Sequence, residues 1–310
     1  MLTRIPKTAI EKGMFVEAVE CSEALFGKRR FVLKSDADLR AIRQCPADFV
    51  VINTAAGSAR AAGSPMAAGS RAGADPHAAG SMDRARAAVI MSDSVRALRQ
   101  GLTGIATGGE LDMKLLAPII AEMADADPAT TSLFFEVSRL KSKDETTFQH
   151  SLAVSVLMGK LGDALGLDRD TVELLVLSGM LHDVGKLSIS NGILQKQGKL
   201  TVAERATIQS HPRRGHQILQ KHADLPPEAL EICLHHHEYL DGSGYPARLS
   251  GAEIGPLVRI ATVCDVFEAL TSARPYKRGW KTADALAWMF DRDQQFDRKL
   301  VLRLGACIDG

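Results

Sequence analysis

A low-complexity stretch at 55–85 constrains the fold most strongly, because it interrupts the chain with a segment that has almost nothing to bury. Of its 31 residues, 23 are Ala, Gly, Ser or Pro, and the tetrapeptide Ala-Ala-Gly-Ser begins at positions 55, 61, 67 and 78. This composition is typical of a linker, although a functional repeat is an alternative. The sequence therefore predicts two folded parts, one at 1–54 and one that begins near residue 86.

The first part, 1–54, is predicted to be a small α+β domain. Short β-rich apolar runs at 31–33 and 49–52 indicate strands, and 36–43 indicates a helix with acidic residues in its first turn. A domain of about 54 residues buries little surface when it is alone. We therefore expect it to have a regulatory role and to dock on the rest of the chain or pair with a second copy as a homodimer.

The second part is predicted to be all-α, so that the chain as a whole is mainly α. We divide it into connecting helices at 86–124 and a main domain at 125–310. The segment 171–181 is apolar almost all round, which indicates a buried central helix. Pro212 predicts a break in a helical segment, and Thr282 is the expected N-cap of the last helix. The predicted helices are 92–104, 111–124, 146–165, 171–181, 202–220, 227–238, 256–272 and 281–290.

Composition narrows the class of protein. The chain has 38 Lys and Arg against 37 Asp and Glu, a net charge of +1, which does not favour a nucleic-acid-binding protein. It contains no apolar run of about 18 residues, so we expect no membrane span. The N-terminus lacks the apolar core of a secretory signal, and the five Cys residues are scattered and form no Cys-x-x-Cys pair. These features favour a cytoplasmic protein with reduced thiols.

Histidine is the unusual component. The chain has nine, and eight lie between His150 and His237. His182 and Asp183 end the most buried predicted helix, where they need either each other or a metal ion to offset their burial. In the triplet His235-His236-His237, adjacent helical residues point about 100° apart, so two can straddle a two-metal site while the third faces elsewhere. A His–Asp pair that caps the core and a polar helix end are the alternatives.

Three further residues could join this group. His150 lies on an apolar helical strip, where it could equally be a core histidine, and His211 precedes the expected break. Asp265 is a carboxylate in an apolar helix and should seek a cation, and Glu268 shares its face. Imidazole and carboxylate without thiolate suit iron or manganese better than structural zinc. Two such ions a few ångströms apart are suited to phosphoester hydrolysis.

These motifs resemble a known family. His182-Asp183 with Gly185-Lys186 is similar to the HD superfamily of metal-dependent phosphohydrolases, and the stretch from His236 to Gly244-Tyr245-Pro246 is similar to its HD-GYP branch. The resemblance covers about 125–295. The N-terminal residues 1–54 resemble, more loosely, a small domain of unknown function often found ahead of HD-GYP. The downstream motifs are Arg259-Ile260-Ala261, Asp265-Val266-Phe267-Glu268-Ala269-Leu270-Thr271 and Arg274-Pro275-Tyr276-Lys277.

The resemblance implies hydrolysis of the bacterial second messenger cyclic di-GMP, to linear pGpG, GMP or both. It implies that Asp183 bridges two metal ions and that Lys186 contacts a phosphate oxygen, which makes these two the catalytic residues. It also implies contacts between the Gly244-Tyr245-Pro246 loop and diguanylate cyclase-type domains. The implied metal ligands are His150, His182, Asp183, His211, His236, His237 and Asp265. The implied substrate-binding residues are Lys186, Tyr245, Glu268, Arg274 and Lys277.

The chain departs from the family pattern in some places. Thr146 stands four residues before His150, where members with a third metal have an acidic residue, so we expect two divalent ions, iron or manganese. Phe267 and Glu268 replace the Tyr and Asp of many relatives. Relatives often continue well beyond the last helix, so we expect a C-terminal cap to be missing. Two alternatives stay open: a phosphohydrolase acting on another nucleotide, and a catalytically silent module that senses cyclic di-GMP or docks proteins.

Overall fold

The computed structural model describes residues 2–19, 31–44, 49–53, 84–106, 108–138, 146–272 and 279–308. It divides the chain into two compact units, Met1–Ser81 and Met82–Ile308. The predicted linker at 55–85 lies outside the described residues, except for the last two, with which the first helix of the larger unit begins.

The smaller unit is an antiparallel sheet with one helix, α1 (Asp36–Gln44). Helix α1 and the strands β3 (Phe31–Val32) and β4 (Phe49–Asn53) confirm the predicted elements, whereas the strands β1 (Leu2–Pro6) and β2 (Phe15–Val19) were not expected. Neither of these two contains a long apolar run, and their pairing with β4 is what orders them. The strands, in the sheet order β1-β4-β2-β3, are β1 (Leu2–Pro6), β4 (Phe49–Asn53), β2 (Phe15–Val19) and β3 (Phe31–Val32).

The core of this unit lies between the sheet and α1. It is made of aliphatic side chains from strands, the helix and the turns between them, so that even a unit of this size has a continuous apolar centre. The buried members are Ile5, Ile10, Met14, Val16, Leu33, Ile42, Val50 and Ile52.

The larger unit is helical, and its described residues contain no strand beyond an isolated bridge between Asp241 and Ser250. This confirms the all-α prediction. Helices α4, α7 and α13 are absent from the sequence-based expectations. Helix α4 is rich in β-branched and aromatic residues, which favour helix only weakly, and α7 has only four residues. The helices are α2 (Arg84–Ala106), α3 (Met113–Asp125), α4 (Pro128–Ser138), α5 (Thr146–Ala164), α6 (Arg169–Leu181), α7 (Asn191–Leu194), α8 (Val202–Gln209), α9 (His211–Leu219), α10 (Pro227–His235), α11 (Pro256–Thr271), α12 (Thr282–Phe290) and α13 (Arg298–Ile308).

Local signals set several helix ends. The expected break at Pro212 is confirmed: α8 ends at Gln209 and α9 begins at His211. Thr201 and Glu204 form a reciprocal capping box at the start of α8. The Thr282 expectation is wrong, because Lys281 occupies the cap position and Thr282 is the first helical residue of α12.

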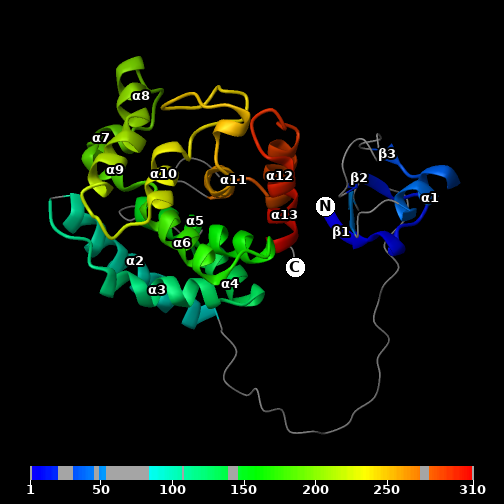
Figure 1. The fold of residues 1–310 in the computed structure, drawn as a ribbon, viewed down its shortest axis with the longest axis horizontal. Helices are drawn as coiled ribbons and strands as arrows, with labels where there is room; N and C mark the ends of the chain where they lie inside the picture. The colour runs from blue at the N-terminus through cyan, green and yellow to red at the C-terminus, as the bar shows by residue number, and fades with distance from the viewer. Residues whose placement is uncertain are drawn as a thin grey trace, which may run out of the picture. The chain divides into compact units, whose positions relative to one another are not determined.

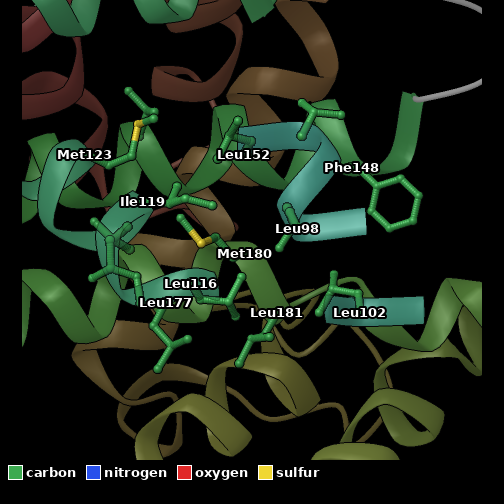
Figure 2. Close-up of a cluster of buried hydrophobic side chains, with 14 of the residues drawn as sticks. Leu98, Leu102, Leu116, Ile119, Met123, Phe148, Leu152, Leu177, Met180 and Leu181 are labelled. Atoms are coloured by element: carbon green, nitrogen blue, oxygen red, sulfur yellow. The ribbon is translucent and has the colours of Figure 1, made fainter. Parts of the chain in front are cut away.

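The core of the larger unit is shared by early and late helices. Figure 1 shows α5 and α6 side by side, with α2, α3 and α4 on one side and α9, α10 and α11 on the other. Figure 2 shows how side chains of α2 and α3, such as Leu98 and Ile119, interleave with Leu152 of α5 and Met180 of α6. The prediction that 171–181 is a buried central helix is confirmed.

Helices α5 and α6 approach each other very closely. A Cβ at Gly179 would lie 2.5 Å from the Cα of Ser155, so no larger residue fits there without displacing a helix. This packing fixes the end of α6 relative to the start of α5, and both places carry predicted metal ligands. None of the helices in the described part of the chain is both long and apolar enough to cross a membrane.

Candidate metal centre

His182 and Asp183 follow directly on the last turn of α6 and are each only 1% exposed. The Nδ1 of His182 donates to the Gly179 carbonyl at 2.7 Å, which leaves Nε2 as the free acceptor of the ring. The buried helix therefore delivers one imidazole and one carboxylate to the same point in the core.

A first group of three possible ligands forms around this point: His150, His182 and Asp183. The Nε2 atoms of His150 and His182 each lie 3.5 Å from Oδ2 of Asp183. Asp265 of α11 joins the group, with its Oδ1 3.0 Å from Nε2 of His150 and 4.0 Å from Nε2 of His182. Three helices, α5, α6 and α11, thus converge on one site.

A second group contains His211, His236 and His237, from the start of α9 and the end of α10. The Nε2 atoms of His211 and His236 lie 3.1 and 3.9 Å from Oδ1 of Asp183. The Nδ1 of His237 lies 3.5 Å from Oδ2 of Asp265. Asp183 therefore turns one oxygen to each group.

The residues of both groups fit bound divalent cations. Within the part of the chain that the structure describes, the buried atom His182 Nε2 has no hydrogen-bond partner, a costly condition that a metal ion would relieve. The donor set is imidazole nitrogen and carboxylate oxygen. The nearby Cys233 thiol donates instead to the backbone carbonyl of His182.

The electrostatics favour the metal-binding protonation state at several of these ligands, although not at His150. Burial lowers the pKa of His182 and His236, and lowers the pKa of His237 to about 3, so these rings are neutral at pH 7. Burial alone would raise the pKa of Asp183, but Lys186, His182 and His211 outweigh it and hold that pKa well below 3.8. A neutral imidazole and an ionised carboxylate are the metal-binding forms.

His150 and Asp265 behave as a coupled pair. Burial would lower the pKa of His150, but Glu268 and Asp265 raise it to about 9. Burial would raise the pKa of Asp265, but His150 and His237 hold it well below its usual range. The carboxylates of Asp265 and Glu268 therefore favour a positive charge beside them.

Lys186 lies beside the centre, in the short 3₁₀ helix Val184–Ser188 that follows Asp183. Its Nζ is 2.5 Å from Oδ2 of Asp183, and its side chain is partly exposed. A Cβ at Gly185 would lie 2.0 Å from the carbonyl oxygen of His211, so this turn packs directly on the start of α9. The lysine is thereby held within reach of an anion at the centre.

The Gly244-Tyr245-Pro246 segment lies against the second group. The backbone N–H of Tyr245 donates to the His237 carbonyl at 3.1 Å, and the Tyr245 ring centroid is 4.7 Å from that of His237. A Cβ at Gly244 would lie 2.5 Å from the Cα of Glu238, so glycine is required for this approach. Burial and the neighbouring Asp265 and Asp183 raise the pKa of Tyr245, which keeps its phenol protonated.

Glu238 holds the segment that follows. Its buried carboxylate accepts hydrogen bonds from the backbone N–H groups of Ala247, Arg248 and Leu249 at 2.6, 3.1 and 3.1 Å. The sequence analysis predicts no role for Glu238, although its position directly after the histidine triplet indicates that it lies beside the site. A carboxylate that accepts hydrogen bonds from three backbone N–H groups holds the loop firmly in place.

The remaining predicted residues fall into three cases. His235 joins neither group, and its Nδ1 lies 3.7 Å from Oε1 of Glu238. Glu268 differs from the expected substrate contact, because it is 0% exposed and its Oε2 lies 2.5 Å from Nδ1 of His150. Arg274 and Lys277 lie outside the described residues.

Comparison with known proteins agrees with this geometry. A family model described as HD domain matches residues 136–300, and one described as a domain of unknown function, DUF3391, matches 2–116. Cyclic di-GMP phosphodiesterase PA4108 of Pseudomonas aeruginosa is 34% identical over 308 residues, which cover 96% of this chain and 74% of that protein. The 3'3'-cGAMP-specific phosphodiesterase 1 of Vibrio cholerae is 43% identical over 136 residues, 44% of this chain and 31% of that protein.

A solved structure shows the same fold. Bd1817, an HDG"Y"P protein from Bdellovibrio bacteriovorus, matches with a TM-score of 0.62 at 16% identity, over 100% of both chains. The family match, the long relative and the two ligand groups around Asp183 lead to one conclusion: the chain belongs to the HD domain family, in its HD-GYP branch, and carries a DUF3391 domain at its N-terminus.

Proposed function

We propose that this protein is a metal-dependent phosphodiesterase that hydrolyses cyclic di-GMP to pGpG, GMP or both. The observation that carries the proposal is Asp183, whose two oxygens face two separate groups of buried ligands. The relative of Pseudomonas aeruginosa, matched over nearly the whole of this chain, is a cyclic di-GMP phosphodiesterase and supports the choice of substrate.

We propose two ions per chain, one in each group, with Asp183 as the bridge. Bound there, divalent cations would act as Lewis acids on the phosphodiester and would activate water as the nucleophile. Iron or manganese suits the donor set, because every proposed ligand is an imidazole or a carboxylate. His150, His182 and Asp265 would complete the first site, and His211, His236 and His237 the second.

The chain's own side chains would bind and orient the substrate. Lys186 is placed to neutralise a phosphate oxygen, and the protonated Tyr245 borders the second group, where it can donate a hydrogen bond to the ligand. Cyclic di-GMP carries a second phosphate and two guanines that the centre cannot hold. We propose that Arg274 and Lys277, which lie outside the described residues, bind these parts.

The test of function compares substrates on metal-loaded protein. Hydrolysis of cyclic di-GMP well above that of 3'3'-cGAMP supports the proposal. Preference for 3'3'-cGAMP, the substrate named for the Vibrio cholerae relative, supports the alternative of another nucleotide. Tight binding of cyclic di-GMP by fully loaded protein without any turnover identifies the silent sensor.

A second test concerns Arg274. Replacing Arg274 with Ala should raise KM for cyclic di-GMP by about 10- to 100-fold, the effect of roughly 1.5–3 kcal/mol for a lost charge-assisted hydrogen bond. It should hardly change turnover of bis(p-nitrophenyl) phosphate, which has no second phosphate. Equal loss on both substrates would place Arg274 in support of the metal centre instead.

Three further proposals concern partners and location. We propose that diguanylate cyclase-type domains dock on the Gly244-Tyr245-Pro246 loop, because the two residues that directly follow it, Ala247 and Arg248, have exposed side chains. Titration with such a purified domain, against an Arg248→Glu variant, tests this.

The small N-terminal unit supports homodimer formation, which sedimentation measures. We propose a reducing, cytoplasmic environment, because Cys233, Cys264 and Cys307, the cysteines among the described residues, form no disulfide.

A further inference from the structure

We infer that Glu268 is a positioning residue that holds the ring of His150 for the first metal, and that it does not contact substrate. The inference rests on the metal centre proposed above. The family resemblance implies that Glu268 binds substrate, whereas in the structure its carboxylate contacts His150.

His150 is held differently from three of the other histidines. His182, His211 and His236 each direct Nδ1 to a backbone carbonyl three residues earlier, those of Gly179, Ile208 and Cys233, at 2.7, 2.7 and 2.9 Å. These rings are therefore oriented by their own local backbone. The Nδ1 of His150 instead lies 2.5 Å from Oε2 of Glu268, a residue 118 positions away.

Both ring nitrogens of His150 face carboxylates of the same helix. On the Nε2 side, Oδ1 of Asp265 lies at 3.0 Å, and on the Nδ1 side lies Glu268. Asp265 and Glu268 are three residues apart in α11 and share its face toward α5. The position of α11 thus sets both the direct contact of Asp265 and the orientation of His150.

Glu268 is itself fixed and inaccessible. It is 0% exposed, and its second oxygen, Oε1, accepts a hydrogen bond from the hydroxyl of Ser272. Ser272 caps the end of α11 and is also buried. A carboxylate with one oxygen on a ligand histidine and the other on a serine has no oxygen facing solvent through which to reach a substrate.

This arrangement has a chemical consequence. A carboxylate on the far nitrogen of a ligating histidine fixes its tautomer and raises its basicity, and its removal typically costs about 10- to 100-fold in metal affinity or activity. Glu268 would therefore act on the first site alone. The second group, whose rings are held by backbone or by contacts elsewhere, should keep its ion.

The experiment measures metal retention in Glu268→Gln, which keeps the size of the side chain but removes its charge. Manganese-loaded full-length protein is dialysed against increasing chelator, and the remaining ions per chain are counted. We expect one of the two ions to be lost at about 10- to 100-fold lower chelator concentration than in the unmodified protein, and His150→Ala to lose that same ion. Retention of both ions as in the unmodified protein would overturn the inference.

Kinetics separate positioning from substrate contact. At saturating manganese, Glu268→Gln should recover most of its kcat with an unchanged KM for cyclic di-GMP. A raised KM with unchanged metal retention would show that Glu268 contacts substrate. Because the metal count needs no substrate, it stands even if cyclic di-GMP proves not to be hydrolysed, so failure of the proposed function and failure of this inference give different results.

A milder variant decides the matter if Glu268→Gln fails to fold. Ser272→Ala removes only the hydroxyl that holds Oε1 and should weaken retention of the same ion by a smaller factor, about 2- to 10-fold. Its matched control is Ser94→Ala, a buried serine of α2, a helix that carries none of the proposed ligands. Equal retention in the two serine variants would contradict the inference.

Discussion

Asp183 is the residue on which both metal sites depend, because one of its oxygens faces each ligand group. Asp183→Ala should therefore reduce the metal content from close to two ions per chain to well below one. Turnover should fall by at least about 100-fold, since both Lewis acids are disturbed. Elemental analysis and a circular dichroism spectrum measure metal and fold together; a folded variant with full metal and full activity would refute the bridging role.

The histidine triplet gives a second test on neighbouring residues. His236 is fully buried in the second ligand group, whereas His235 is half-buried and points to Glu238. His236→Ala should lose one ion and nearly all turnover. His235→Ala, the matched control, should change kcat/KM by less than about 3-fold. A large loss confined to His235 would show that the ligands are displaced by one residue.

For individual residues, the sequence predicts which side chains belong to the metal centre, but it does not predict every contact that those side chains make. Clustering and local setting single out His182, Asp183 and Asp265, and the structure brings them within 4.0 Å of one another or of shared neighbours. Glu268 of α11 contacts His150 of α5, and Glu238 binds the backbone N–H groups of 247–249 in the loop that follows it. The contact of Glu268 could not be predicted from sequence spacing, because only the packing of α11 on α5 brings it to His150.

Among the elements, the loop from Gly244 to Leu249 is ordered by contacts that tolerate little change. In Gly244→Ala the new methyl group would lie 2.5 Å from the His237 oxygen, so the loop must shift and carry Tyr245 with it. We expect KM for cyclic di-GMP to rise at least about 10-fold with metal content unchanged. The control is Gly192→Ala in α7, where a Cβ meets nothing within 4 Å. An unchanged KM would mean that Tyr245 does not help to bind the substrate.

Element prediction succeeds where a local signal decides the outcome. Pro212 breaks the helical segment because proline lacks an N–H and clashes in a helix interior, and the all-round apolar pattern of α6 predicts its burial. It fails for β1, where Ile5 pairs with Val50 and other strand residues far along the chain. That pairing energy is non-local, so the sequence near Ile5 carries little trace of it.

The larger compact unit of the molecule begins well before residue 125, where the sequence places the start of the main domain. The compact larger unit begins at Met82, and α2 and α3 share a core with α5 and α6. A low-complexity stretch marks the division near residue 81 clearly. Nothing in the local sequence shows that 86–124, interpreted as connecting helices, supplies part of that core.

This organisation predicts unequal effects of two truncations. A chain of residues 82–310 should fold and keep its metal, whereas 126–310 should not. The longer deletion removes the buried Leu98, Leu102, Leu116 and Ile119, and at about 1.5–3 kcal/mol each this approaches the whole stability of a typical domain. Thermal unfolding and metal content of the two fragments provide the check. Cooperative unfolding of 126–310 with bound metal would show that α2 and α3 are dispensable.

If the protein is a two-metal cyclic di-GMP phosphodiesterase, its turnover of cyclic di-GMP depends on the number of ions bound per chain. Apo protein is titrated with manganese or, without oxygen, with iron, and both quantities are read on the same samples. A two-metal centre should give almost no turnover until loading approaches two ions per chain, and full turnover there. Full turnover by metal-free protein, or none at two ions per chain, would contradict it.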